Sequence, residues 1–412
     1  MSDGLGNCQT PAVSGRQWTN GLLRERWFGL CAAGWAIGYI IILTQRLIQH
    51  NLPSGLDGKH CADFTWIWLS SRLATFGAID RIYDYSLFSA ARAVLVGPPN
   101  CVLDHFDYPP TLLLFTYLLG LMPYLIAFAI WMAATLLLYL AAVYAIIPRL
   151  AAIIVALTPF PVFINVLLGH NGFLSAGLIG LALAIMKERP GLSGILLGLL
   201  TYKPQLGILI PFALLASRNW RVFLAAAATS VLFAAIATVV FGYNAWPLFI
   251  DALADRASTL SEVPEEVAPL VSVFGAFRMF HASPASSGVA QLSVTAIAAV
   301  TVCALWARPI PHSLKAAALC SGALLAAPHA ISYDACILSI AIAFLVADGL
   351  SRDFLPGDRV AMLMCWPAVI LAMGPVPSIV SLVLLILVVR RAILCGEAAT
   401  APVSGIMAGV HD

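Results

Sequence analysis

Carboxylates are concentrated in one polar stretch of a chain that is otherwise poor in charge. The stretch runs from about Asn51 to Tyr108 and separates two long apolar segments. It holds six aspartates: Asp57, Asp63, Asp80, Asp84, Asp104 and Asp107. In a chain made for lipid, a carboxylate cluster between two apolar segments is where we expect acid–base chemistry.

Asp63 is the first candidate among these aspartates. It directly precedes a segment in which Trp66, Leu69 and Leu73 follow helical spacing, with Arg72 on another face. An aspartate at that place suits two roles. It is a preferred N-cap, which the helix dipole favours, and it is also a carboxylate at the membrane surface that can act as a catalytic base. The pattern alone leaves both roles open.

A possible metal set lies at the end of the polar stretch. Asp104 and Asp107 flank His105 just before Tyr108-Pro109-Pro110. Proline in the first turn of a helix is ordinary, so these residues suit the start of the second span. A metal site is the weaker alternative, and no metal is expected.

Three further polar interruptions fall at breaks in apolar segments. Lys203-Pro204 divides one segment, His170 and Asn171 follow a glycine in another, and His329 precedes Asp334 by five positions. A lysine at such depth requires an anion or water, and phosphate is one such anion; the alternative is a side chain that extends to the membrane surface. By our count of spans, all three breaks lie on the same side as the carboxylates. We therefore expect a common cavity.

The composition fixes the class of protein. Of 412 residues, 61% are hydrophobic and 10% are charged, whereas soluble proteins carry roughly a quarter charged residues. The apolar runs are continuous rather than alternating, which excludes a β-barrel. The sequence therefore predicts an all-α polytopic membrane protein. The net charge of +2 is uninformative, but no basic tract is present, so nucleic acid is not expected as a partner.

The arginines near the N-terminus predict the topology. Arg16, Arg24 and Arg26 precede the first apolar segment, so residues 1–26 are expected in the cytoplasm. One transmembrane domain, 27–391, follows, with outer loops at about 49–108 and 243–287 and with amphipathic helices in both. Residues 392–412 are expected to be a cytoplasmic tail. Cys61 and Cys101, in the first loop, are either a disulfide or two thiols.

About a dozen spans are expected. They are placed at about 27–47, 109–122, 124–147, 172–186, 221–241, 288–307, 314–328, 334–348, 359–373 and 376–391. The segment 150–168 contains two prolines and is predicted to be bent or re-entrant. The segment 191–216 is predicted to be two short helices that meet at Tyr202-Lys203-Pro204, because basic turns precede and follow it.

Taken in order, these motifs resemble those of glycosyltransferase family 87, the polyprenol-phosphate-mannose-dependent mannosyltransferases with the GT-C fold. The resemblance rests on one span, an outer loop with Asp63-Phe64, the Tyr-Pro-Pro of Tyr108, a Gly-His-Asn break, a Lys-Pro tip and a Pro-His…Tyr-Asp junction. It covers about residues 27–347. The family usually has glutamine where this chain has His170.

The resemblance implies a transfer of sugar from a lipid-linked phosphate donor on the outer, periplasmic face of a bacterial inner membrane. By this resemblance Asp63 is the general base and the anomeric configuration inverts. Lys203, with Arg72 and His329, stabilises the leaving phosphate. The other expected substrate-binding residues are His170, Asn171, Tyr108 and Asp334. No cofactor is expected, and the partners are the polyprenyl-phosphate-sugar donor, a glycolipid or glycan acceptor, and the bilayer.

Two other functions are compatible with a polytopic protein of this kind. A transporter or flippase of lipid-linked sugars predicts internal repeats and charges at the membrane midplane. The sequence shows no repeat, and its charges collect at the outer edge. A polysaccharide polymerase or ligase usually carries its large outer loop late in the chain, whereas the richest loop here is the first. A hexosyltransferase, with mannose as the first candidate sugar, fits the sequence better than either.

Overall fold

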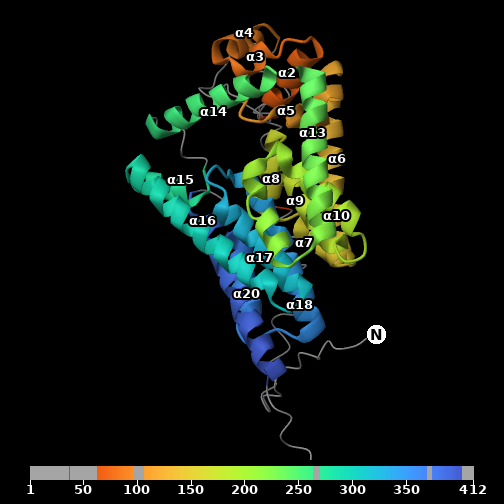
Figure 1. The fold of residues 1–412 in the computed structure, drawn as a ribbon, viewed down its shortest axis with the longest axis vertical. Helices are drawn as coiled ribbons and strands as arrows, with labels where there is room; N and C mark the ends of the chain where they lie inside the picture. Colours follow the sequence, from red (N-terminus) through yellow and green to blue (C-terminus); the bar gives the residue numbers. More distant parts are fainter. Residues whose placement is uncertain (1–36, 38–62, 96–105, 263–269, 369–373, 401–412) are drawn as a thin grey trace, which may run out of the picture.

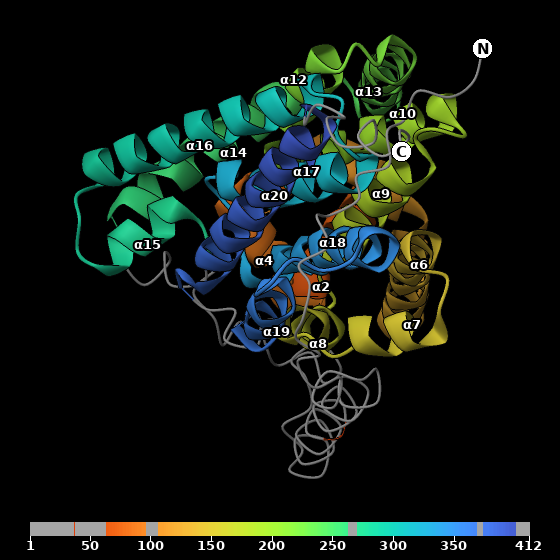
Figure 2. The ribbon, with the colours of Figure 1, turned by 90° about the horizontal axis from the view of Figure 1, so that it is seen from below.

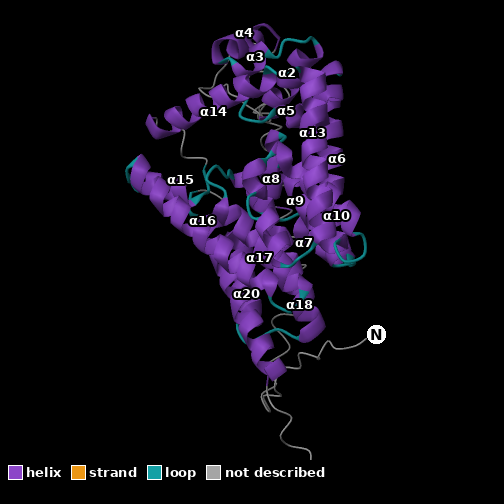
Figure 3. Ribbon diagram, viewed as in Figure 1, coloured by secondary structure: helices purple, strands orange, loops and turns teal. Residues whose placement is uncertain are grey.

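The computed structural model describes residues 37, 63–95, 106–262, 270–368 and 374–400 (Figure 1). Within these residues the chain forms helices and loops, and one isolated β-bridge joins Leu270 to Ile331 (Figure 3). The predicted all-α fold is confirmed. Outside the described residues lie the predicted first span apart from residue 37, and Asp57, Cys61, Cys101, Asp104 and His105.

Three helices occupy the polar stretch where amphipathic helices are predicted: α2 (Asp63–Thr75), α3 (Asp80–Tyr83) and α4 (Tyr85–Leu95). Their apolar faces are buried, with Phe64, Leu69 and Phe88 nearly inaccessible. Two hydrogen bonds tie α2 to the segment that follows. The Trp68 indole donates to the carbonyl of Met122 over 3.0 Å, and the Ser71 hydroxyl donates to Thr116 over 2.7 Å. These helices therefore form a fixed cap at one end of the molecule (Figure 1).

Five helices in the described part of the chain are long and apolar enough to cross a membrane. They are α6 (Tyr124–Ile146), α13 (Trp220–Phe241), α16 (Pro284–Ala307), the continuous stretch from η4 (Ser332–Ala335) through α18 (Cys336–Arg352), and α20 (Val376–Thr400). The chain is a multi-pass membrane protein on this evidence. The predicted dozen spans is not confirmed.

Several predicted spans are shorter helices in the structure. Apolar helices of 10–17 residues cover Pro110–Leu121, Gly172–Ile185, Pro190–Tyr202 and Pro204–Ala216. Four further helices in the second half of the chain are α14 (Ala245–Glu262), α15 (Val273–Met279), α17 (His312–Ala326) and α19 (Asp358–Ala368). Helix α20 continues to Thr400, into the residues predicted to be a tail.

Both predicted interruptions are present. Helices α7 (Leu150–Ala156) and α8 (Phe160–Leu168) meet at a bend of 68°. The segment after Pro190 divides into α10 (Pro190–Gly198), η2 (Leu199–Tyr202), α11 (Pro204–Gly207) and α12 (Ile210–Ala216). The division falls at Lys203, because Pro204 has no N–H to donate and its ring would clash with a helix continuing from before it.

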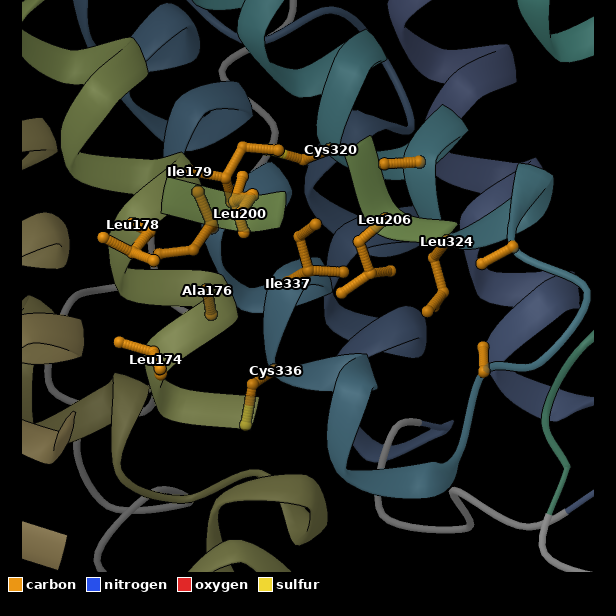
Figure 4. Close-up of a cluster of buried hydrophobic side chains, with 14 of the residues drawn as sticks. Leu174, Ala176, Leu178, Ile179, Leu200, Leu206, Cys320, Leu324, Cys336 and Ile337 are labelled. Atoms are coloured by element: carbon orange, nitrogen blue, oxygen red, sulfur yellow. The ribbon is translucent and has the colours of Figure 1, made fainter. Parts of the chain in front are cut away.

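The interior is built around α17 and α18, which are buried along most of their length. Helix α9 (Gly172–Ile185) packs against both α18 and α6. Figure 4 shows the apolar cluster where these elements meet, with Leu174 of α9, Leu206 of α11, Leu324 of α17 and Ile337 of α18. Seen from below, α6 and α7 lie on the flank opposite α15 (Figure 2). The helix breaks described below sit at one edge of this cluster.

Candidate active site

Lys203 lies at the break between η2 and α11, with 2% of its surface exposed. Its ammonium group donates to Oδ1 of Asp334 over 2.6 Å and to Oδ1 of Asn171 over 3.1 Å. Asp334, in η4, is 1% exposed. A buried ion pair is tolerated only with good geometry and further hydrogen bonds. Here both are present, so the predicted lysine and aspartate form one unit despite lying 131 positions apart.

The second oxygen of Asp334 is also engaged. Oδ2 accepts from the backbone N–H of Ile331 over 3.1 Å, while the N–H of Asp334 donates to the Ile331 carbonyl over 2.8 Å. The carboxylate is therefore fixed from two sides, by its own turn and by Lys203. This arrangement keeps the lysine charge at a defined place in an apolar surrounding.

Aromatic side chains enclose the Lys203 ammonium. It lies 4.5 Å from the ring centroid of Tyr333 and 5.8 Å from that of Tyr108, within cation–π range. The two tyrosine hydroxyl groups are 3.1 Å apart, and the ring of His170 stacks on Tyr333 at 3.6 Å. We call Tyr108, His170, Asn171, Lys203, Tyr333 and Asp334 the site cluster. Five of its six members are residues that the sequence singled out, and Tyr333 is the addition.

Asn165 holds the backbone of the site cluster together, and the sequence reading missed it. Its amide nitrogen donates to the Tyr333 carbonyl over 3.2 Å, and its amide oxygen accepts from the N–H of Gly172 over 2.9 Å. A Cβ atom on Gly172 would lie 2.3 Å from the Tyr333 carbonyl oxygen. The only sequence signal was an amide inside an apolar helix, which in membranes often bonds across helices.

A second ion pair adjoins the site cluster. Nε of Arg256, from α14, lies 3.1 Å from Oδ2 of Asp107, the residue before Tyr108. Arg256 is 8% exposed. The sequence reading placed it on an interfacial helix without assigning it a role. An arginine on an amphipathic helix is usually solvated, so the sequence alone gave no sign that this side chain is buried.

His329 is half-buried in the loop between α17 and η4. Burial lowers the pKa of its imidazole, the Asp107 carboxylate opposes that shift, and the positive charges of Arg256 and Lys203 add to it. Burial also lowers the pKa of His170 well below its usual range, with a further contribution from Lys203. Both imidazoles are therefore neutral at pH 7. His329 therefore lies within electrostatic reach of both ion pairs, Lys203–Asp334 and Arg256–Asp107.

Asp63 is the first residue of α2, and its side chain lies outside the described part of the chain. Its neighbour Phe64 is fully buried, with ring contacts to Tyr124 and Phe128 at 5.4 and 5.3 Å. The Cβ of Phe64 packs against Gly169. A Cβ added to Gly169 would lie only 2.5 Å from the Cβ of Phe64. Gly169 caps α8 with a φ of +71°. The backbone at Asp63 is thus one residue from a contact with the segment that presents His170.

Arg72 is placed differently. Its guanidinium donates to the carbonyl of Gly120 over 3.0 Å and lies 5.5 Å from the ring centroids of Trp68 and Phe76. These contacts belong to the last turn of α2. They do not bring Arg72 to the site cluster. Its predicted role toward phosphate stays a prediction.

Among the described residues, no group of three or more His, Cys, Asp or Glu side chains is arranged to hold a metal ion. The polar groups of the site cluster are instead an ammonium, a carboxylate, two phenols, an amide and one imidazole. Groups of this kind bind hydroxyls and anions by hydrogen bonds. The arrangement suits a sugar attached to an anionic group.

A family model for glycosyltransferase family 87 matches residues 106–328, which is more than half of the chain. No curated protein and no solved structure matches it. The matched region includes Tyr108, His170, Asn171, Lys203 and Arg256 and ends one residue before His329. The chain therefore belongs to glycosyltransferase family 87, and it is a multi-pass membrane glycosyltransferase.

Proposed function

We propose that this enzyme transfers a hexose, with mannose as the first candidate, from a polyprenyl-phosphate-sugar donor to a glycolipid or glycan acceptor of the cell envelope. The reaction takes place on the periplasmic face of a bacterial inner membrane and inverts the anomeric configuration. Membership of family 87 supports the reaction class. The observation that carries the proposal is that the start of α2, with Asp63, packs beside the segment that presents His170 to the site cluster.

Asp63 is the proposed general base. Its carboxylate takes the proton of an acceptor hydroxyl while that oxygen attacks the anomeric carbon from the face opposite the phosphate. The bond between the anomeric carbon and the phosphate oxygen breaks, and polyprenyl phosphate leaves with the electron pair. A phosphate leaves without a general acid, so one carboxylate suffices, whereas glycosidases use two. A positioned base of this kind contributes about 10²–10⁴-fold in rate.

The site cluster is proposed to bind the donor and meet the charge on the leaving phosphate. Lys203 neutralises Asp334, which would otherwise repel an anion. Because His329 is neutral at pH 7, its ring N–H can donate a hydrogen bond to a phosphate or sugar oxygen. The paired hydroxyls of Tyr108 and Tyr333 are suited to sugar hydroxyls. Fixed donors in a water-poor site stabilise developing negative charge strongly.

The direct test replaces Asp63 in purified protein supplied with a synthetic polyprenyl-phosphate hexose in detergent. Asp63→Asn removes the base, and Asp63→Ser also removes it with a second residue type that is preferred at helix N-caps. Both variants are expected to lose about 10²–10⁴-fold in turnover with an unchanged melting temperature. Detergent offers no second compartment, so product formation also separates transfer from transport.

Asp84→Asn is the matched control. Asp84 belongs to the same polar stretch and caps helix α4. Its Oδ1 accepts from the N–H of Leu87 over 2.9 Å. This variant is expected to keep full turnover. Normal activity of both Asp63 variants contradicts the role of Asp63 as base. Activity of the wild type with a nucleotide sugar but not with the lipid phosphate contradicts the proposed donor.

A further inference from the structure

The inward face of α14 carries a charge. Phe249 and Ala252 are half-buried on that face, and Arg256 follows one turn later with 8% of its surface exposed. The carboxylates of α14 whose exposure the structure describes, Asp251 and Asp255, point to the outside. A helix needs only apolar side chains to pack, and a buried guanidinium is costly unless it is paired. Arg256 is paired with Asp107 over 3.1 Å, and it is the place of this pair, next to Tyr108 of the site cluster, that suggests a role beyond packing.

The exposed side chains of helix α14 suit the layer of lipid headgroups. It begins three residues after the 22-residue apolar helix α13 and runs across the end of that span (Figure 1). Ile250 and Leu253 are 60% and 48% exposed, next to the exposed carboxylates. A helix with outward apolar and charged side chains across the end of a span lies in the membrane interface. Lipid phosphates occupy the same layer.

Arg256 stands between that layer and the site cluster. Asp107 holds its Nε at 3.1 Å, and Asp107 is followed in the chain by Tyr108. Asp107 is half-buried, whereas Lys203 and Asp334 are enclosed. Of the two cations, Arg256 is therefore less enclosed than Lys203. A guanidinium carries five N–H donors in a planar fork, so it can hold a carboxylate and a phosphate together.

We propose that Arg256, positioned by Asp107, binds a lipid-borne phosphate beside the site cluster. The phosphate belongs either to the polyprenyl donor or to a phospholipid-type acceptor. The inference rests on the proposed function, since it names the residue that receives the anionic lipid. A purely structural ion pair would only join α14 to the first outer loop. In this proposal the Arg256 guanidinium also contacts the substrate.

The test compares Arg256→Gln and Arg256→Lys with wild type, with Arg278→Gln as the control. Arg278 is an arginine of α15 whose guanidinium donates to its own turn, at the Ala282 carbonyl. Turnover and the KM for donor and for acceptor are measured in detergent. Binding of farnesyl phosphate, a short-chain probe, is followed by tryptophan fluorescence.

Loss of a charge-assisted hydrogen bond predicts that Arg256→Gln raises one KM about ten- to a hundredfold, with a smaller change in kcat. Arg256→Lys recovers part of the loss, and Arg278→Gln has no effect. A rise in the donor KM together with weaker farnesyl phosphate binding assigns the phosphate to the donor. A rise confined to the acceptor KM assigns it to the acceptor.

Two results overturn the inference. One is an unchanged KM for both substrates in Arg256→Gln. The other is an equal fall in melting temperature for the Gln and Lys variants with no change in KM, which is the signature of a structural pair. If the wild type does not use a polyprenyl-phosphate sugar, the proposed donor fails, and the difference in farnesyl phosphate binding between wild type and Arg256→Gln still decides the role of Arg256.

Discussion

Two groups of buried charges lie at opposite ends of α18, and they differ in what surrounds them. At its start, Lys203 and Asp334 meet two tyrosines, an asparagine and a histidine drawn from separate helix breaks. At its other end lies what we call the distal network: Asp348 and Arg352 of α18, with Asp358, Arg390 and Arg391. The 17 residues of α18 span about 25 Å at 1.5 Å per residue.

The distal network is made of groups that satisfy one another. Arg391 donates from Nε to Asp348 over 2.8 Å and pairs with Asp358. The Asp358 carboxylate also receives Arg390 over 3.1 Å and the N–H of Leu355 over 3.1 Å. These contacts join α18, α19 and α20. Charges paired in this way fasten helix ends, whereas the site cluster presents two phenol hydroxyls and an imidazole. Buried charge alone does not mark a site; the chemistry of its neighbours does.

The largest expected effect separates the two groups by activity. Lys203→Met leaves the Asp334 carboxylate buried without its counter-ion and is expected to destabilise the fold by about 3–5 kcal/mol. Turnover is expected to fall by about 10²–10³-fold, as when a fixed donor is lost. A double variant with Asp334→Leu removes both charges, so it should recover stability but not turnover. Thermal unfolding and turnover, measured on the same samples, check both.

Asp348→Asn is the matching change in the distal network. It leaves Arg352 and Arg391 with less counter-charge, so a similar loss of stability, about 3–5 kcal/mol, is expected. Turnover per folded molecule should stay within about twofold of wild type, because this network is remote from the cluster. Recovery of turnover in the Lys203/Asp334 double variant, or its loss in Asp348→Asn, would remove the distinction between the two ends.

A smaller effect is expected from crowding the backbone under the site cluster. Gly172→Ala places a Cβ 2.3 Å from the Tyr333 carbonyl oxygen and 2.7 Å from the Asn165 amide. Overpacking of this kind costs about 1–3 kcal/mol, and a shift of Tyr333 should lower turnover as well. Gly191→Ala is the control, since a Cβ there meets nothing within 4 Å. Equal melting temperature and turnover in the two variants would contradict this packing.

The smallest effect is on the pH dependence of stability. Because burial lowers the pKa of His170 and His329 in the folded state, their contribution to stability is present above the unfolded value of about 6.5. It is lost as pH falls toward the lowered folded values, because the unfolded chain binds protons first. The melting temperature should therefore fall between pH 7.5 and 5.5. A His170→Gln, His329→Gln double variant should show a shallower fall; an equal slope would contradict the assignment.

The sequence predicted which helix breaks lie together better than it predicted the membrane spans, and the reason is physical. Proline or glycine beside a polar residue in an apolar run marks a helix break, and breaks in a membrane protein face protein or a wet cavity. Lys203 and His170 were found in this way. Hydropathy, in contrast, does not tell a full span from a short buried helix, so Gly172–Ile185 was counted as a span.

Arg256 shows the other limit. Helix α14 lies in the second outer loop, where the sequence predicted an amphipathic helix. Its apolar residues Ile250 and Leu253 are exposed in the structure. The outward face of a helix in lipid is apolar. A charged side chain of such a helix can therefore face either the protein interior or water, and the sequence pattern does not distinguish the two. Pairing of Arg256 with Asp107, about 150 positions away along the chain, is set by tertiary packing that periodicity does not encode.

The central claim is that Asp63 and a lipid phosphate held at or beside the site cluster face the same anomeric carbon. The most direct measurement is an electron cryomicroscopy structure of the Asp63→Asn variant with an intact polyprenyl-phosphate hexose bound. We predict that the phosphate lies within hydrogen-bond distance of a side chain among Lys203, Arg256 and His329, with the sugar between it and residue 63. A phosphate at the distal network, or a sugar turned away from residue 63, would contradict the account.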